Sequence, residues 1–156
     1  MDFPKIPRRL ILPALLLVAT ATVRADDAAW NLSLQLHSFH EHTSAVDLHD
    51  NTPGLGVMRV TPDNFLVGAG IFRNSLGRTA GYAYVGKEWA LGKVLVGGIA
   101  GVTHHYNFNN GGPVPLAAAI VTVPVNDRWA VDILGIPHLA DYTYATLHLA
   151  LRWRFN

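Results

Sequence analysis

The C-terminal segment alternates strictly between two kinds of side chain, and this constrains the fold more than any other feature. Large apolar residues occupy every odd position from 147 to 155, while the even positions from 148 to 154 hold histidine, alanine and two arginines. Successive side chains of a β-strand point to opposite faces, so the pattern predicts a strand with one face suited to lipid and one suited to a polar interior. Residues 30–37 repeat it, with tryptophan and leucine alternating with asparagine, serine, glutamine and histidine.

The first 25 residues have the layout of a cleaved signal peptide. Lys5, Arg8 and Arg9 precede an apolar run over residues 10–19, and Val23-Arg24-Ala25 fits the small-residue rule for cleavage. The apolar run is about half as long as a membrane-spanning helix requires. We therefore predict a signal peptide over residues 1–25 and one domain over residues 26–156.

Turn-rich clusters divide this domain into eight candidate strands, near residues 29–40, 53–61, 64–73, 79–91, 93–107, 114–126, 128–136 and 142–155. Tight connections alternate with longer ones, as in barrels whose short turns face the periplasm. Strands with one solvent-exposed face also occur in soluble β-sandwiches. However, the aromatic C-terminal segment Trp153-Arg154-Phe155 resembles the C-terminal signature of outer-membrane barrels. The predicted fold is an all-β, eight-stranded antiparallel transmembrane β-barrel in the bacterial outer membrane.

Composition limits which partners the protein can have and indicates what fills the barrel interior. The chain has no cysteine, which excludes disulfides, and without the signal peptide it is slightly acidic, so nothing indicates a nucleic-acid partner. Residues 94–102 alternate mainly between aliphatic residues and glycine, which predicts a partly apolar interior. Such an interior either leaves room for a hydrocarbon chain or is simply a filled core. Prolines at strand ends either open the wall to lipid or only terminate strands.

Three residues have the side chains that acyl transfer needs. His37 offers an imidazole to move a proton, Ser75 a hydroxyl, and Asn74 a group to orient the imidazole, and both segments reach the predicted outer rim. With eight histidines in the chain, however, such a trio arises easily. The spacings of the histidines at 37–42 and 104–105 do not set a chelating face on a strand, so we predict no metal and no cofactor.

The chain resembles the lipid A palmitoyltransferase family (PagP) through short motifs in consistent order. They are Phe72-Arg73-Asn74-Ser75, Gly81-Tyr82, residues 96–103 (VGGIAGVT), Pro113-Val114-Pro115 and Gly135-Ile136-Pro137. Residues 34–39 (LQLHSF) are similar to the segment bearing the family's essential histidine. The resemblance implies an acyltransferase that moves a palmitoyl chain from the sn-1 position of a glycerophospholipid donor to a lipid A acceptor, as a monomer in the outer membrane.

The resemblance also implies roles for single residues. His37 would be the base, Ser75 its hydroxyl partner, and Asn74 would stand where the family has an orienting acid. Pro115 and Pro137 match prolines that flank a lateral route for lipid, and Gly86 lies roughly where the family's acyl-length-setting glycine falls.

Arg73 and Arg78 bracket the loop that carries Ser75. We expect their charges either to engage lipid phosphates or to be solvated. Two alternatives to the acyltransferase stay open: a noncatalytic small barrel with a structural or adhesive role, and a lipid A deacylase or esterase.

Overall fold

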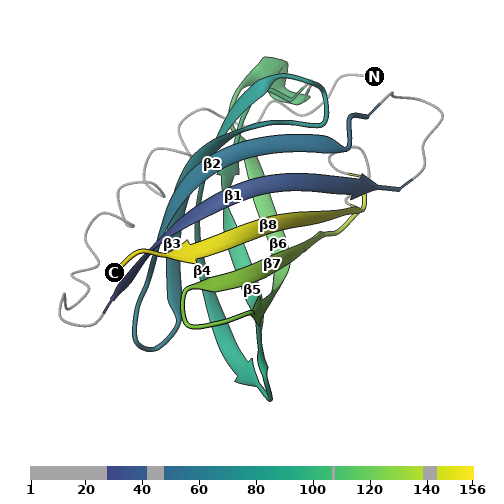
Figure 1. Cartoon of the computed structure of the whole chain (residues 1–156). Coiled ribbons are helices and arrows are strands. Elements are labelled where there is room, and N and C mark those ends of the chain that lie inside the picture. Colours follow the sequence, from purple (N-terminus) through teal and green to yellow (C-terminus); the bar gives the residue numbers. More distant parts are fainter. Residues whose placement is uncertain (1–27, 42–47, 107, 139–143) are drawn as a thin grey trace.

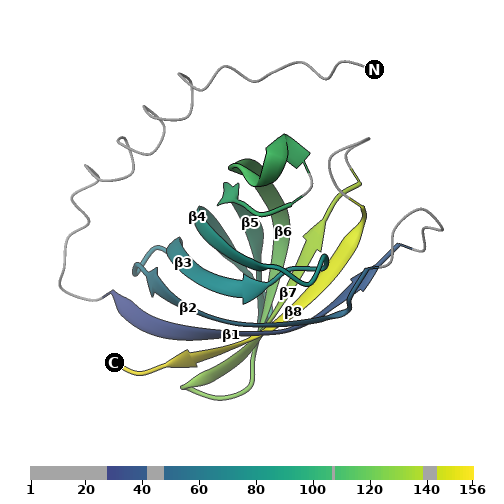
Figure 2. The ribbon, with the colours of Figure 1, turned by 90° about the horizontal axis from the view of Figure 1, so that it is seen from above.

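The protein is a closed barrel of eight antiparallel strands. The computed structural model describes residues 28–41, 48–106, 108–138 and 144–156, and the predicted signal peptide lies outside these residues. Each strand pairs with its neighbour in sequence, and β1 pairs with β8 to close the ring, as Figures 1 and 2 show. The predicted eight-stranded antiparallel barrel is confirmed.

The strands follow the predicted positions closely. They are β1 (Ala29–His40), β2 (Asn51–Val60), β3 (Phe65–Arg73), β4 (Thr79–Leu91), β5 (Val94–Thr103), β6 (Val114–Pro124), β7 (Trp129–Ile136) and β8 (Thr146–Arg154). The fifth strand ends four residues before the predicted 107, because His105 adopts a positive φ of 64°. A short 3-10 segment, η2 (Phe108–Gly111), follows it with Asn109 and Asn110 also at positive φ.

The outer face of the barrel is apolar. Large side chains that are exposed on this face include Leu36, Phe39, Leu55, Val57, Val67, Ile71 and Leu147. Trp30, Trp89, Trp129 and Trp153 lie near the end that carries the tight turns 61–64, 92–93 and 125–128. An apolar band with interfacial aromatic residues around a partly polar interior is the pattern of outer-membrane barrels, and it places this barrel in the bacterial outer membrane.

The two ends of the barrel differ in their connections. The tight turns mark the periplasmic end, and the opposite end, here called the outer rim, is where the strands joined by the longer connections end, together with the described residues next to them (41, 48–50, 74–78, 104–106, 108–113, 137–138 and 144–145). Among the helices of the described residues, none has the length and apolar character needed to cross a membrane.

The middle of the interior is a packed core. Met58, Leu66, Ile99 and Ile120 are buried against one another. Tyr84 packs against this cluster, and its ring stacks on that of Tyr82 with centroids 6.0 Å apart. At this level, the filled-core interpretation of the sequence describes the interior better than the open one.

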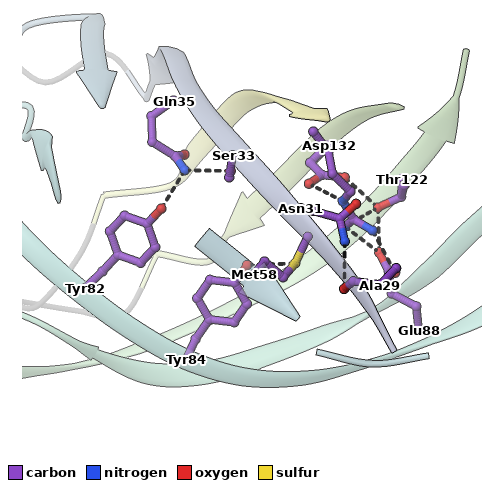
Figure 3. A network of polar contacts seen from close by, with 11 residues as sticks. Ala29, Asn31, Ser33, Gln35, Met58, Tyr82, Tyr84, Glu88, Thr122 and Asp132 are labelled. Carbon is purple, nitrogen blue, oxygen red and sulfur yellow. Dashed lines mark hydrogen bonds and ion pairs between the residues drawn. The ribbon is translucent and has the colours of Figure 1, made fainter. Parts of the chain in front are cut away.

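A buried ion cluster fills the interior near the periplasmic end. Arg152 donates from Nε to Asp132 at 2.9 Å and from Nη1 and Nη2 to Glu88 at 3.3 and 3.1 Å. The Thr122 hydroxyl lies between the two carboxylates, and Figure 3 shows the group beside the stacked tyrosines. One guanidinium therefore holds two buried carboxylates together across β4, β7 and β8.

Candidate functional site at the outer rim

A serine, a histidine and an aspartate lie in sequence at the outer rim. The Ser75 hydroxyl is 2.8 Å from Nε2 of His40, and Nδ1 of the same ring is 3.0 Å from Oδ1 of Asp50. The His40 side chain is only 7% exposed, whereas that of Asp50 is 55% exposed. The three residues come from the end of β1, the residue before β2 and the turn between β3 and β4.

The partners of His40 fix its tautomer. An ionised carboxylate only accepts hydrogen bonds, so Asp50 requires the proton on Nδ1 and leaves Nε2 of the neutral ring as an acceptor. The Ser75 hydroxyl then donates to Nε2. This is the order of roles in a Ser-His-Asp triad, in which the imidazole takes the proton of the nucleophilic hydroxyl.

Backbone contacts hold the triad together. The amide of His49 donates to the carbonyl of Ser75 at 2.8 Å, and the amide of Ser38 donates to the carbonyl of Asp50 at 2.7 Å. The first contact ties the segment before β2 to the β3–β4 turn, and the second ties it to β1. Asp50 and Ser75 are thereby set on either side of the His40 ring.

The structure does not join His37, the predicted base, to Ser75. A register shift between Gln35 and His37 interrupts both pairings of β1, so the alternation of faces ends at Gln35. Beyond this β-bulge Ser38 is buried inside, while the His37 ring packs on exposed Phe39 with centroids 4.6 Å apart. The extra residue turns His37 to the outer face and brings His40 to the site instead.

Asn74 does not orient a histidine ring either. Its side chain is fully buried, Oδ1 accepts from the amides of Leu76 and Arg78 at 3.1 and 3.0 Å, and Nδ2 donates to the carbonyl of His105 at 3.0 Å. Asn74 therefore shapes the turn that presents Ser75 and ties it to the segment after β5. An acid at this position, as in the family that the sequence resembles, would lack the donor for His105.

We expect Asn74→Asp to destabilise the rim, because it removes the donor to His105 and sets a carboxylate oxygen against a carbonyl oxygen. A buried group left without its partner costs about 1–3 kcal/mol. Asn126→Asp is the matched control, since Asn126 uses the same oxygen to accept from Arg128 and Trp129 in an exposed turn. Urea unfolding measures the difference, and equal midpoints for the two variants would contradict this role of Asn74.

The two predicted phosphate-binding arginines flank the serine turn. Arg73 ends β3 and Arg78 precedes β4, and both are exposed. Nη2 of Arg73 lies 3.6 Å, and Nε2 of His49 3.4 Å, from where a Cβ on Gly77 would stand. Cationic and hydrogen-bonding groups therefore cover the turn beside Ser75.

The remaining predicted residues lie apart from the triad. Gly86 faces the interior, where an added Cβ would come within 2.7 Å of the Gly98 carbonyl and 2.8 Å of the Ile99 side chain. Pro115 is exposed in β6 opposite Val102, and Pro137 is exposed just after β7.

A second polar group lies in the interior below the triad. His148 contacts the Ser38 hydroxyl at 2.8 Å through Nδ1 and the Gln35 carbonyl oxygen at 2.7 Å through Nε2. Gln35 in turn donates to the Tyr82 hydroxyl at 2.8 Å, a contact drawn in Figure 3. These groups hydrogen-bond to one another and form the floor of the site.

An ion pair at the rim predicts a response to acid. Glu41 and His138 are 2.9 Å apart, and the Glu41 amide donates to the Ala145 carbonyl. The hydrogen bond from His138, followed by a backbone hydrogen bond from Ala145 to the carboxylate, lowers the pKa of Glu41 from its ordinary 4.5. A lowered carboxyl pKa stabilises the folded form above pH 4.5, and the effect is lost as pH falls below it.

We therefore expect the amide of residue 41 to lose hydrogen-exchange protection in the native chain as the pH falls below 4.5. The Glu41→Gln variant should show reduced protection at pH 6 and no such pH dependence, because its side chain does not titrate. Identical profiles for the two proteins would show that the pair does not hold the rim.

Among residues 28–41, 48–106, 108–138 and 144–156, no three His, Asp or Glu side chains are grouped so as to hold a metal ion.

Comparison with known proteins does not identify a family for this chain. No protein-family model matches the chain, and no curated protein matches it significantly. Among solved structures, the backbone structure of the Yersinia pestis outer membrane protein Ail in a phospholipid bilayer nanodisc is similar, with a TM-score of 0.49 and 13% identity. The match covers 83% of this chain and 100% of the Ail chain. This likeness is too distant to bear on function.

Proposed function

We propose that this barrel is an outer-membrane acyltransferase that acts on membrane lipids at its outer rim, with Ser75 as the nucleophile and His40 as the base. The observation that carries the proposal is the arrangement of Ser75, His40 and Asp50, with contacts of 2.8 and 3.0 Å in the order that acyl transfer requires. A serine activated in this way at the rim of a membrane barrel suits an ester substrate that lies in the same membrane.

The proposed reaction has two halves. In the first, His40 takes the Ser75 proton, Ser75 attacks the ester carbonyl, the bond to the glycerol oxygen breaks, and that oxygen leaves as an alcohol with the proton from His40. In the second, His40 deprotonates the acceptor hydroxyl, which attacks the acyl-serine and releases Ser75, and the proton returns to the serine. Asp50 holds the tautomer and stabilises the charged imidazole in both halves.

The turn between β3 and β4 limits which groups can stabilise the negative charge that develops on the ester carbonyl oxygen when Ser75 attacks. The amides of Leu76 and Gly77, next to the nucleophile, already donate to Asn74. Side chains therefore have to supply the positive charge, and Arg73 and Arg78 are the cations adjacent to the turn. Arginine also suits the phosphates of a glycerophospholipid donor and of lipid A.

The specific substrates rest on the sequence resemblance. Similarity to the lipid A palmitoyltransferase family supports transfer of a palmitoyl chain from the sn-1 position of a glycerophospholipid to lipid A. The triad supports the reaction class alone, and it serves equally well when water is the acceptor, which would make the protein a lipid A deacylase or esterase.

A noncatalytic barrel is the second candidate, and the interior favours it. The ion cluster around Arg152 and the packed tyrosines fill the barrel in a way that serves stability without any reaction. In such a protein, Ser75, His40 and Asp50 would only tie the rim segments together.

Incubating the purified barrel with lipid A and a phospholipid labelled in its sn-1 palmitoyl chain separates these candidates. The proposal predicts labelled, palmitoylated lipid A and an equal amount of lysophospholipid, with neither product from the Ser75→Ala variant. Free fatty acid without acylated lipid A would identify a hydrolase. Absence of all products from the native protein would favour the noncatalytic barrel.

A further inference from the structure

An apolar groove lies in the barrel wall directly below the turn that carries Ser75. It has a volume of about 310 Å³, and its lining includes Ala69 of β3, Gly81 and Ala83 of β4, Val102 of β5, and His104 and Pro113 beyond β5. Ala69 pairs with Ala83, and Ala83 pairs with Val102, so the groove crosses three adjacent strands. Its volume is at the lower end of the range for ligand pockets.

The end of β5 explains why the wall is hollow here. The last pair between β4 and β5 is Tyr82 with Thr103. Just above it, the Gly81 amide donates to Nε2 of His104 at 2.9 Å, and the Gly81 carbonyl accepts from the Thr103 hydroxyl at 3.0 Å. Side chains thus satisfy a backbone that no β5 strand covers, and alanine and glycine add little bulk to the outer face.

The interior behind the groove offers no comparable space. A Cβ on Gly68 would lie 2.5 Å from Cζ of Tyr84, and one on Gly70 would lie 2.6 Å from the Tyr82 hydroxyl. The two stacked tyrosines therefore occupy the space that these inward glycines leave. A hydrocarbon chain that entered the barrel at this level would have to displace them.

We propose that the groove holds the acyl chain of the lipid substrate, so that the chain lies along the outer wall of the barrel while its ester reaches Ser75. The inference rests on the proposed function. Of its lining, Ala69, Ala83 and Pro113 are exposed on the outer wall, which faces lipid, so the occupant that reaches the groove from the membrane is a hydrocarbon chain. Ala83 lies four residues below the start of β4 at Thr79, about 13 Å at about 3.3 Å per residue, so a chain that starts at the rim reaches the groove.

Filling the groove tests this placement. Ala83→Phe and Ala69→Phe add bulk inside it, and Ala117→Phe adds the same bulk at an exposed alanine of β6 that does not line it. With donors that differ only in acyl length, we expect Ala83→Phe to lower transfer of the longest chains by about tenfold, the order of effect of a misfitted apolar subsite. Short chains should be affected less, and Ala117→Phe should match the native protein.

A phospholipid with a photoreactive acyl chain gives a readout that does not need turnover. In the Ser75→Ala background, we expect cross-links to residues 69–83 to exceed those to the lipid-facing residues of β8, and Ala83→Phe to remove the excess. Heat-dependent gel mobility verifies that each variant forms the barrel.

The outcomes separate the two proposals. If the native protein transfers acyl chains but Ala83→Phe changes neither chain preference nor cross-linking, or if Gly86→Ala alone shifts the preference, the groove is not the acyl site and the proposed function stands. If the native protein transfers nothing while the excess cross-linking depends on Ala83, the groove binds lipid and the proposed function is wrong.

Discussion

Replacing His40 by alanine is expected to reduce acyl transfer by about 100- to 10,000-fold, the contribution that a positioned general base makes. The same change at His37 should alter the rate by no more than about threefold, because His37 lies on the outer face against Phe39 and His40 contacts Ser75. The measurement is the initial rate of labelled palmitate transfer by each purified variant.

His37→Ala is a matched control for His40→Ala, since both remove one imidazole from the same end of β1. Heat-dependent gel mobility should show that both variants form the barrel. A large loss with His37→Ala and none with His40→Ala would contradict the site described here and support the assignment from the sequence resemblance.

The largest effect on stability should come from Arg152→Met. Arg152 is the cation between Glu88 and Asp132, and all three side chains are at least 90% buried. Removing one partner of a buried ion pair costs about 3–5 kcal/mol, because the charge left behind is buried without a counter-ion. The free energy of unfolding in urea at neutral pH should fall by that amount.

Two further variants show whether this loss of stability comes from the unpaired carboxylates. Arg154→Met changes an exposed arginine two residues along β8 and should be nearly neutral. Combining Arg152→Met with Glu88→Gln and Asp132→Asn removes both stranded charges and should restore much of the stability. An Arg152→Met protein as stable as Arg154→Met would show that the cluster does not hold the barrel together.

Most of the fold could be predicted from the local alternation of apolar and polar side chains. The pattern from 147 to 155 and its repeat from residue 30 assign faces correctly as far as Gln35, because a side-chain period of two is a property of every regular strand. Clusters of turn residues then divide the domain into eight strands, and eight strands are enough to form a closed barrel. The fifth strand was predicted too long because the positive φ angles of His105, Asn109 and Asn110 after Thr103 depend on local backbone contacts, which hydropathy does not reveal.

The site was predicted only in part. The sequence singled out Ser75 and its rim position, but not His40 or Asp50 as its partners, because one extra residue near Leu36 reverses the faces of β1. The position of Phe39 indicates this bulge. If the alternation were unbroken, a strand that turns His37 inward would also turn Phe39 inward and would leave Ser38 and His40 facing lipid. The contact with Asp50 depends on how the residue before β2 lies against the end of β1, which spacing in the sequence does not reveal.

Asn74 is a different case. The sequence identified it as a member of the site, yet its partners are the backbone groups of Leu76, Arg78 and His105. An amide beside a serine suits an orienting group and a turn-forming group equally well. Only the position of the segment after β5 distinguishes these two roles.

The most direct test of the account is the mass spectrum of lipid A from cells that express the native protein or its Ser75→Ala variant at equal outer-membrane levels. We expect lipid A to gain one palmitoyl group with the native protein and none with the variant. Identical lipid A in the two strains, or a palmitoyl gain that persists without the Ser75 hydroxyl, would contradict it.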